Sequence, residues 1–324
     1  MRSIATCAAA CVLTSPLLAL PASAADLIVS AQDGKFVRVE GQATFPQPAP
    51  PDSLVVLDAA RFPPVVKATV DQGIEHTVQG PPQAVAITPD GRLAIVAAPT
   101  RYDYAAKKEL FDTFLQVVDL EASPPAVVAR VEVGAHPNGL TINRDGTLLL
   151  AAAHDGTVKV CTLEGKTVKF AGQVKVGEKR LAGISFTHDG KAAIVALRDE
   201  NGAAVLSIDG SQVSLTKERI STGVNPYAVD VSSDGRWAVI GNTGISRTVD
   251  DADVVTLVDV RQRPFRAVQQ ISVRPRRRAS RSRPTGAGSP SRRWRGPTSS
   301  RRIRAGARPE SSRSTRSRTV APRR

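Results

Sequence analysis

A repeated alternation of apolar and polar residues runs through the middle of the chain. Each repeat has apolar residues at positions i and i+2, then Asp-Gly, then a second apolar run. The alternation is typical of half-buried strands, and Asp-Gly supplies the positive φ that a tight hairpin requires. Four hairpins are predicted, at residues 82–91, 137–146, 181–190 and 226–235. Their Asp-Gly steps are 55, 44 and 45 residues apart, so the unit is a long repeat.

Two further strands are predicted in each repeat, for example at 157–163 and 167–176. One period is therefore a four-stranded antiparallel sheet, and four-stranded units of about 40 to 50 residues are typical of propeller blades. The predicted fold class is all-β, a β-propeller of four-stranded antiparallel blades.

The first blade is expected to lack its innermost strand. Residues 27–30, 53–58 and 65–70 match the second, third and fourth strands of the unit, with a Pro-rich loop at 41–52. A ring closes and hides its strand edges when the missing inner strand comes from the C-terminus. The intact protein is therefore expected to end in a strand and to have six or seven blades, of which about five are encoded in frame.

The residues that open two of the repeats resemble a known family. Gly134-Ala135-His136-Pro137-Asn138-Gly139 and Gly223-Val224-Asn225-Pro226-Tyr227-Ala228 are similar to the blade openings of the bacterial YVTN-type β-propeller proteins. That family is similar in fold to the seven-bladed lactonase family. The resemblance covers roughly residues 27–273. It implies the propeller fold and carries over no catalytic residue position by position.

The N-terminus has the pattern of a secretory signal peptide at 1–24. A basic residue precedes an apolar stretch, and Ala22-Ser23-Ala24 is an A-x-A cleavage site. A membrane anchor is the alternative, although the apolar stretch is short for spanning a bilayer. Cys7 and Cys11 leave with the signal peptide, so the mature chain keeps Cys161 and forms no intramolecular disulfide. The expected location is periplasmic or secreted.

The excess of positive charge, which gives the chain a formal net charge of +14, lies in residues 274–324. This segment has 18 Arg, no Lys and one acidic residue, Glu310, a net of +17, so the rest of the chain carries −3. The propeller at 25–273 is therefore mildly acidic, and the pI near 10.3 gives no argument that it binds nucleic acid. The tail itself is too polar and charged to fold, and one interpretation is a disordered tail for nucleic acid or anionic lipid.

A one-base frameshift near 273–278 is the other interpretation of the tail. Residues 279–294 can be back-translated with GC-rich codons, and the same DNA read one base earlier gives Gly-Val-Ala-Phe-Ser-Pro-Asp-Gly-Arg-Trp-Leu-Ala-Val-Ala-Ala-Met. That sequence is the strand, Asp-Gly turn and strand of another repeat. Residues 274–324 are therefore interpreted as a continuation of the propeller in the wrong frame.

Candidate chemistry is expected in loops on one face of the propeller. The loops before the first strand and between the second and third strands open on the same face, the usual site face of this fold. The candidate ligand-binding residues are Arg101, Tyr102, Asp103, Tyr104, Arg198, Asn225 and Arg247. The candidate general bases for attack of water on an ester are His136 and His154. The candidate oxygen ligands for Ca²⁺ are Asp250, Asp251 and Asp253, and solvated polar loops are the alternative for all of these residues.

Three functions remain open. The first is an exported propeller scaffold that binds a protein or small ligand through its loop face, the second a lactonase-like hydrolase, and the third a propeller subunit of a periplasmic redox enzyme. The propeller has no Gly-x-Ser-x-Gly, HExxH, CxxC, CxxCH or phosphate-loop motif, so no cofactor is expected. We expect a monomer, with no nucleic-acid partner for the propeller and no membrane span after signal cleavage.

Overall fold

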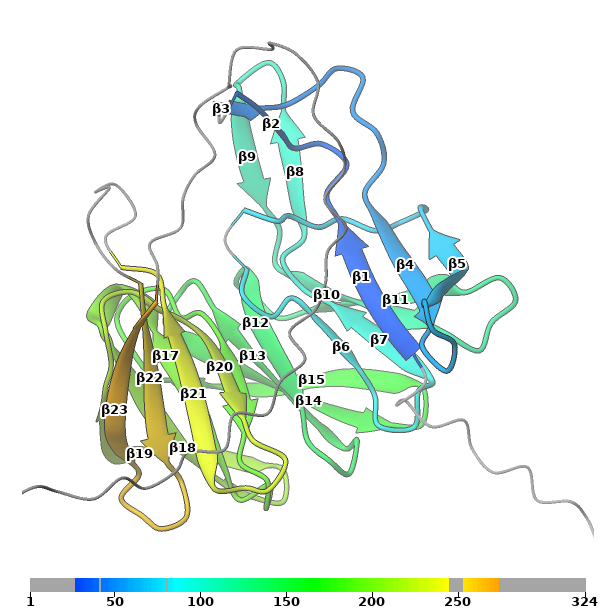
Figure 1. The fold of residues 1–324 in the computed structure, drawn as a ribbon. Coiled ribbons are helices and arrows are strands. Elements are labelled where there is room, and N and C mark those ends of the chain that lie inside the picture. The colour runs from blue at the N-terminus through cyan, green and yellow to red at the C-terminus, as the bar shows by residue number, and fades with distance from the viewer. Residues whose placement is uncertain (1–26, 41, 80, 245–252, 274–324) are drawn as a thin grey trace, which may run out of the picture. The chain divides into compact units, whose positions relative to one another are not determined.

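The computed structural model describes residues 27–40, 42–79, 81–244 and 253–273, and these residues are all-β. They form five antiparallel sheets that follow one another along the chain as propeller blades (Figure 1). The predicted fold class is confirmed. The predicted signal peptide at 1–24 and the Arg-rich tail at 274–324 lie outside the described residues. Within the described ranges, no helix is long and apolar enough to cross a membrane.

Blade 1 has three strands and blades 2 to 5 have four each. Blade 1 contains β1 (Leu27–Gln32), β4 (Ser53–Asp58) and β5 (Val65–Val70). Blade 2 contains β6 (Val85–Ile87), β7 (Leu93–Val96), β10 (Phe114–Asp119) and β11 (Ala126–Glu132). Blade 3 contains β12 (Pro137–Ile142), β13 (Leu148–Ala153), β14 (Thr157–Glu164) and β15 (Thr167–Lys175). Blade 4 contains β16 (Ile184–Phe186), β17 (Ala192–Leu197), β18 (Gly202–Asp209) and β19 (Gln212–Ser221). Blade 5 contains β20 (Pro226–Val231), β21 (Trp237–Asn242), β22 (Asp253–Asp259) and β23 (Arg266–Val273).

Two short hairpins are added to this repeat. They are β2 (Val37–Val39) with β3 (Gln42–Thr44), and β8 (Thr100–Asp103) with β9 (Lys108–Phe111). The sequence pattern predicts loops at residues 41–52 and around residues 101–104, and the structure has short strands there instead. Lys107, with a φ of 49°, lies in the turn that joins the two strands of the second hairpin. Phe45, beside β3, stacks on Tyr102 of β8 with ring centroids 3.7 Å apart, so each hairpin stabilises the other.

The predicted Asp-Gly turns are confirmed in blades 2 to 5. The glycine of each turn has a φ between 68° and 74°. In blade 4 the carboxylate of Asp189 accepts hydrogen bonds from the Thr187 hydroxyl at 2.6 Å and from the Lys191 backbone N–H at 3.1 Å. Blades 2 and 5 repeat the same pattern. The turn is therefore fixed by contacts within five residues of sequence.

The core consists of apolar layers between successive blades. One buried cluster lies between each pair of neighbours from blade 1 to blade 5. Every residue of β13 and β17 is buried, because blades 3 and 4 have a neighbour on both faces. In β4 and β21 buried positions instead alternate with more exposed ones, because blades 1 and 5 each have one covered face.

Gln83 ties the inner strands together near the axis. Its side-chain nitrogen donates to the Val229 carbonyl at 2.8 Å, and its side-chain oxygen accepts from the Ile184 N–H at 3.2 Å and the Val229 N–H at 3.3 Å. Its own carbonyl accepts from the Leu140 N–H at 2.8 Å. One side chain from blade 2 therefore satisfies backbone groups of blades 4 and 5.

Candidate functional site

The structure places His136, His154 and Arg198 in the class of loops predicted for them. His136 precedes the first strand of blade 3, and His154 follows its second strand. Arg198 begins a 3₁₀ turn, Arg198–Glu200, between the second and third strands of blade 4. In an antiparallel blade these loops share one end, so the three side chains belong to the same face.

His136 and His154 form a ring cluster with Phe111. The two imidazole centroids are 4.5 Å apart, and the Phe111 centroid is 5.0 Å from His136 and 5.7 Å from His154. The Nδ1 atom of His136 lies 3.0 Å from the Asp112 carbonyl oxygen. Because a carbonyl only accepts hydrogen bonds, Nδ1 carries the proton and Nε2 of the neutral ring presents a lone pair.

Burial lowers the pKa of both imidazoles. For His136 loss of hydration is the largest cause, and the hydrogen bond to the Asp112 carbonyl opposes it. For His154 the pKa is lowered to about 3, mainly by burial and also by electrostatic interactions with His136, Arg180 and Arg198. Both rings are therefore neutral at pH 7, and two guanidinium groups lie near enough to act on His154.

Arg198 is the most unusual side chain of this face. Its Nε and Nη1 atoms are buried and make no hydrogen bond to any described residue. Its guanidinium carbon lies 5.2 Å from the centroid of the Tyr227 ring. Burial lowers its pKa, and the charge of Arg180 lowers it further. Unused donors on a partly buried cation are costly, so this geometry suits an anion.

A set of contacts between two loops positions the arginine pair. The Oε1 atom of Glu200 accepts hydrogen bonds from the backbone N–H groups of Glu178 at 2.8 Å and Lys179 at 2.9 Å. The Nη2 atom of Arg180 lies 3.5 Å from Oδ1 of Asp199. The loop before β16 is thus fixed to the 3₁₀ turn that carries Arg198. Both acidic residues of this turn are therefore engaged, Asp199 by Arg180 and Glu200 by the two backbone N–H groups.

Arg101 acts on the histidine cluster through Asp112. Its Nε and Nη2 atoms donate to the two carboxylate oxygens of Asp112 at 2.7 and 2.8 Å. This bidentate pair raises the pKa of Arg101 and lowers the pKa of Asp112. The Asp112 carbonyl in turn accepts from His136. Arg101 is therefore a positioning residue in this structure, and direct ligand binding by it stays a prediction.

Tyr102, Asp103 and Tyr104 make contacts that hold the added hairpins. Tyr102 stacks on Phe45, and the Tyr104 hydroxyl donates to the Pro46 carbonyl at 2.7 Å. Oδ1 of Asp103 accepts two backbone N–H groups of the turn that follows it. These contacts give the three residues a local structural role. Their predicted contact with a ligand remains untested.

Asn225 closes the loop before blade 5. With a φ of 51°, it donates from Nδ2 to the Gly244 carbonyl at 2.6 Å, and its N–H donates to Asn201 Oδ1 at 3.0 Å. The other predicted residues here are Arg247, Asp250 and Asp251, which lie outside the described residues, and Asp253, whose side chain is not described. No group of three or more possible metal ligands occurs in the described part of the chain, so the Ca²⁺ prediction stays open.

Sequence reasoning missed Arg180. In the repeat alignment this residue immediately precedes the blade opening, as His136 and Asn225 do in their own blades. Comparing that one position across the repeats would have found it. It also missed His76, whose imidazole is buried and whose Nδ1 lies 3.2 Å from the Ala97 carbonyl oxygen.

A buried charged cluster joins blade 1 to blade 2 beside His76. Lys35 Nζ pairs with Asp52 Oδ2 at 2.6 Å and with Asp33 Oδ1 at 3.2 Å, and it also donates to the His76 carbonyl. Asp52 accepts further hydrogen bonds from the backbone N–H groups of Gly34 and His76. One lysine faces two carboxylates, and the carboxylates also accept backbone N–H groups of the chain, so we assign the cluster to the joining of the two blades.

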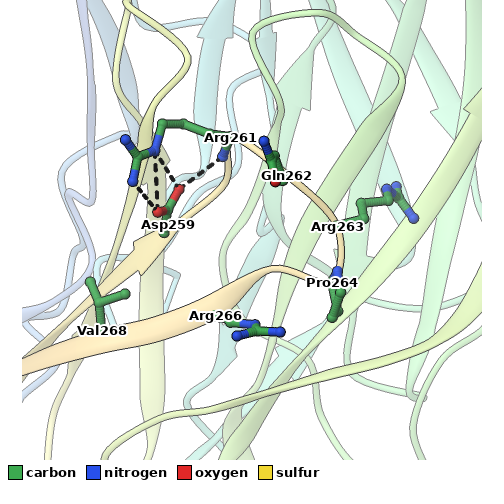
Figure 2. A pocket seen from close by; sticks show the side chains of 7 residues that line it. All are labelled: Asp259, Arg261, Gln262, Arg263, Pro264, Arg266 and Val268. Atoms are coloured by element: carbon green, nitrogen blue, oxygen red, sulfur yellow. Dashed lines mark hydrogen bonds and ion pairs between the residues drawn. The ribbon is translucent and has the colours of Figure 1, made fainter.

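A pocket of about 480 Å³ lies at the turn between β22 and β23, and Figure 2 shows the side chains that line it. It is lined by Asp259, Arg261, Gln262, Arg263, Pro264, Arg266 and Val268. Arg261 already pairs with Asp259, and Arg263 pairs with Glu218 at 3.0 Å. This turn lies at the end of the blade opposite the loop face. Because most of its charge is neutralised within the chain, we do not assign the site to this pocket.

No protein-family model and no curated protein matches this sequence, but solved structures match its fold. A protein of unknown function from Desulfotomaculum acetoxidans has a TM-score of 0.53 and 19% identity, with 68% of this chain and 63% of that chain covered. A candidate 6-phosphogluconolactonase from Bacteroides uniformis has a TM-score of 0.52 and 12% identity, with 78% and 69% covered. The periplasmic gluconolactonase of Pseudomonas aeruginosa has a TM-score of 0.51 and 17% identity, with 68% and 64% covered.

These similarities define the class of the protein, a β-propeller with gluconolactonases among its structural neighbours. At such identities they show the fold alone. The chain also spans less than two thirds of the length of the Desulfotomaculum and Pseudomonas chains. The YVTN type of the repeat and the activity of the protein remain predictions.

Proposed function

We propose that this protein is a β-propeller that binds a small organic anion on its loop face, with Arg198 as the principal contact. The observation that carries the proposal is the pair of buried Arg198 nitrogen atoms that have no partner among the described residues. A guanidinium presents its donors in a planar fork that matches a carboxylate or a phosphate. Such a ligand would satisfy donors that the described part of the protein leaves unused.

The neighbouring groups suit the same ligand. Arg180 adds a second positive charge, and the neutral ring of His154 can donate one hydrogen bond without adding charge. An anion beside the two arginines would also offset their mutual repulsion, which contributes to the lowered pKa of Arg198. The site therefore favours a ligand with one or two negative charges and polar hydroxyl groups, such as a sugar acid.

Binding without turnover is favoured by the low pKa of His154. A general base works best when its pKa lies near the working pH, and a pKa of about 3 makes this imidazole a weak base. This argument supports the ligand-binding propeller over the hydrolase. Export to the periplasm and the YVTN repeat type belong to the same proposal as predictions.

Isothermal titration calorimetry of the purified protein with gluconate, 6-phosphogluconate and neutral glucose tests the binding. We expect the two anions to bind and glucose not to bind. Arg198→Gln should weaken anion binding about 10- to 100-fold, because a hydrogen bond to a charged group is lost in a partly buried site. The matched control is Arg219→Gln, which removes an exposed arginine. Unchanged affinity in Arg198→Gln, or no anion binding by the wild type, would contradict the proposal.

Lactone hydrolysis is the second candidate, and the fixed tautomer of His136 favours it. Nε2 of His136 would take a proton from water as the water oxygen bonds to the lactone carbonyl carbon. The ring C–O bond then breaks, and the imidazolium returns the proton to the leaving alkoxide. Turnover of δ-gluconolactone above the buffer rate, abolished in His136→Asn with anion binding retained, would establish this activity. Binding of the anions without turnover of the lactone would support ligand binding and not hydrolysis.

A further inference from the structure

The sheet of blade 5 has one buried face and one open face. Ala238 and Ile240 of β21 are fully buried in the cluster shared with blade 4, whereas Val239 between them is 41% exposed. The corresponding strands of blades 3 and 4 are buried at every residue. The apolar run 237–240 therefore has the composition of a strand buried on both faces, yet the described residues cover one of them.

The open face carries an apolar stripe across three strands. Val239 lies opposite Leu257, and Val255 lies opposite Ile271, so these four side chains share one face. Ile271 and Val273 of the outer strand are 43% and 39% exposed. The opposite face of the same sheet packs on blade 4. A sheet that is apolar on both faces fits between two other sheets, as blades 3 and 4 do.

Blade 1 is open at its inner edge. β1 pairs with β4, and no other strand of the described residues pairs with its second edge. The backbone groups of that edge form a template for one more strand. The described chain thus ends in an open sheet face at blade 5 and begins with an open strand edge at blade 1. Additional propeller sequence would complete both.

A back-translation of residues 279–294 with GC-rich codons is compatible with such a sequence. Read one base earlier, residues 279–294 contain Ser-Pro-Asp-Gly-Arg-Trp, where blade 5 has Ser232-Ser233-Asp234-Gly235-Arg236-Trp237. The shifted turn falls at the position of Thr285, 51 residues after Asp234 and within the 44 to 55 residues that separate the other turns. We propose that the open face of blade 5 is the docking surface for a sixth blade, encoded by this shifted frame.

Resequencing of the gene and peptide mass spectrometry of the native protein test which sequence occupies the face. We expect a tryptic peptide that ends in Gly-Val-Ala-Phe-Ser-Pro-Asp-Gly-Arg. A peptide that contains Glu310 of the written frame would overturn the proposal.

Charge substitutions in the full protein made from the native gene test the docking surface itself. Val239→Asp would place a charge between two sheets, and we expect the Tm to fall by on the order of 10 °C. Val128→Asp is the matched control, because Val128 is 52% exposed on the outer strand of blade 2, and we expect a change within about 2 °C. Equal Tm values for the two variants would overturn the proposal. A defined dimer that Val239→Asp dissociates would also overturn it, in favour of a second copy of the chain.

Discussion

Acidification from pH 7 to pH 5 is expected to destabilise this protein through a histidine that folds in its neutral form. The pKa of His154 falls from an ordinary value of 6.5 to about 3 in the folded state. Between those values the unfolded chain binds a proton that the folded chain does not. The stability that depends on neutral His154 is therefore fully present above pH 6.5, and the free energy of unfolding decreases as the pH falls below that value.

The size of the effect follows from the two pKa values. At pH 5 an imidazole with a pKa of 6.5 is almost fully protonated and one with a pKa near 3 is almost fully neutral, a difference worth about 2 kcal/mol. Because His154 is not fully buried, solvent screening reduces this to about 1 to 2 kcal/mol. His76 and His136 act in the same direction, since burial lowers their pKa values, and the raised pKa of Glu109 acts in the opposite one.

Urea denaturation at pH 7, 6 and 5 measures the effect in the wild type, in His154→Asn and in His188→Asn. The decrease in unfolding free energy from pH 7 to pH 5 should be about 1 to 2 kcal/mol smaller in His154→Asn than in the wild type. His188 is exposed at the opposite end of the blades, so His188→Asn should follow the wild type. An equal pH dependence in His154→Asn and the wild type would refute the reasoning.

Three further predictions concern the core and the turns. Cys161 is fully buried and its pKa is raised to about 12 by burial, so the folded protein at pH 8 should not react with a thiol reagent until it is unfolded; reaction under native conditions would contradict this. Gly156 and Gly190 both have a left-handed φ, but a Cβ at Gly156 would overlap the Gly177 carbonyl oxygen while a Cβ at Gly190 meets nothing. Thermal melts should therefore show that Gly190→Ala lowers the free energy of unfolding by about 1 to 2 kcal/mol and that Gly156→Ala lowers it clearly more. Equal decreases in the two variants would contradict this packing. Leu150→Ala should lower the free energy of unfolding, measured by urea denaturation, by about 2 to 5 kcal/mol, because Leu150 is fully buried between blades. A decrease below about 1 kcal/mol would be inconsistent with that core.

The sequence by itself determined the blades, because their determinants are local. Alternating apolar residues set the faces of each strand, and an Asp-Gly step with a nearby Thr or Ser closes the hairpin within five residues, as Asp189 and Thr187 do. The repeat of this pattern fixed the number of sheets, and the register of each hairpin followed from its turn. The missing inner strand of blade 1 could be predicted in the same way.

Only the tertiary structure decided which polar side chains meet. Arg180 and Arg198 come from separate loops, and Glu200 and Asp199 bring those loops together through contacts about 20 residues apart in sequence. The low pKa of His154 likewise depends on burial and on charges from three other loop residues. Burial and charge proximity are set by how whole blades pack, and no short stretch of sequence contains that information.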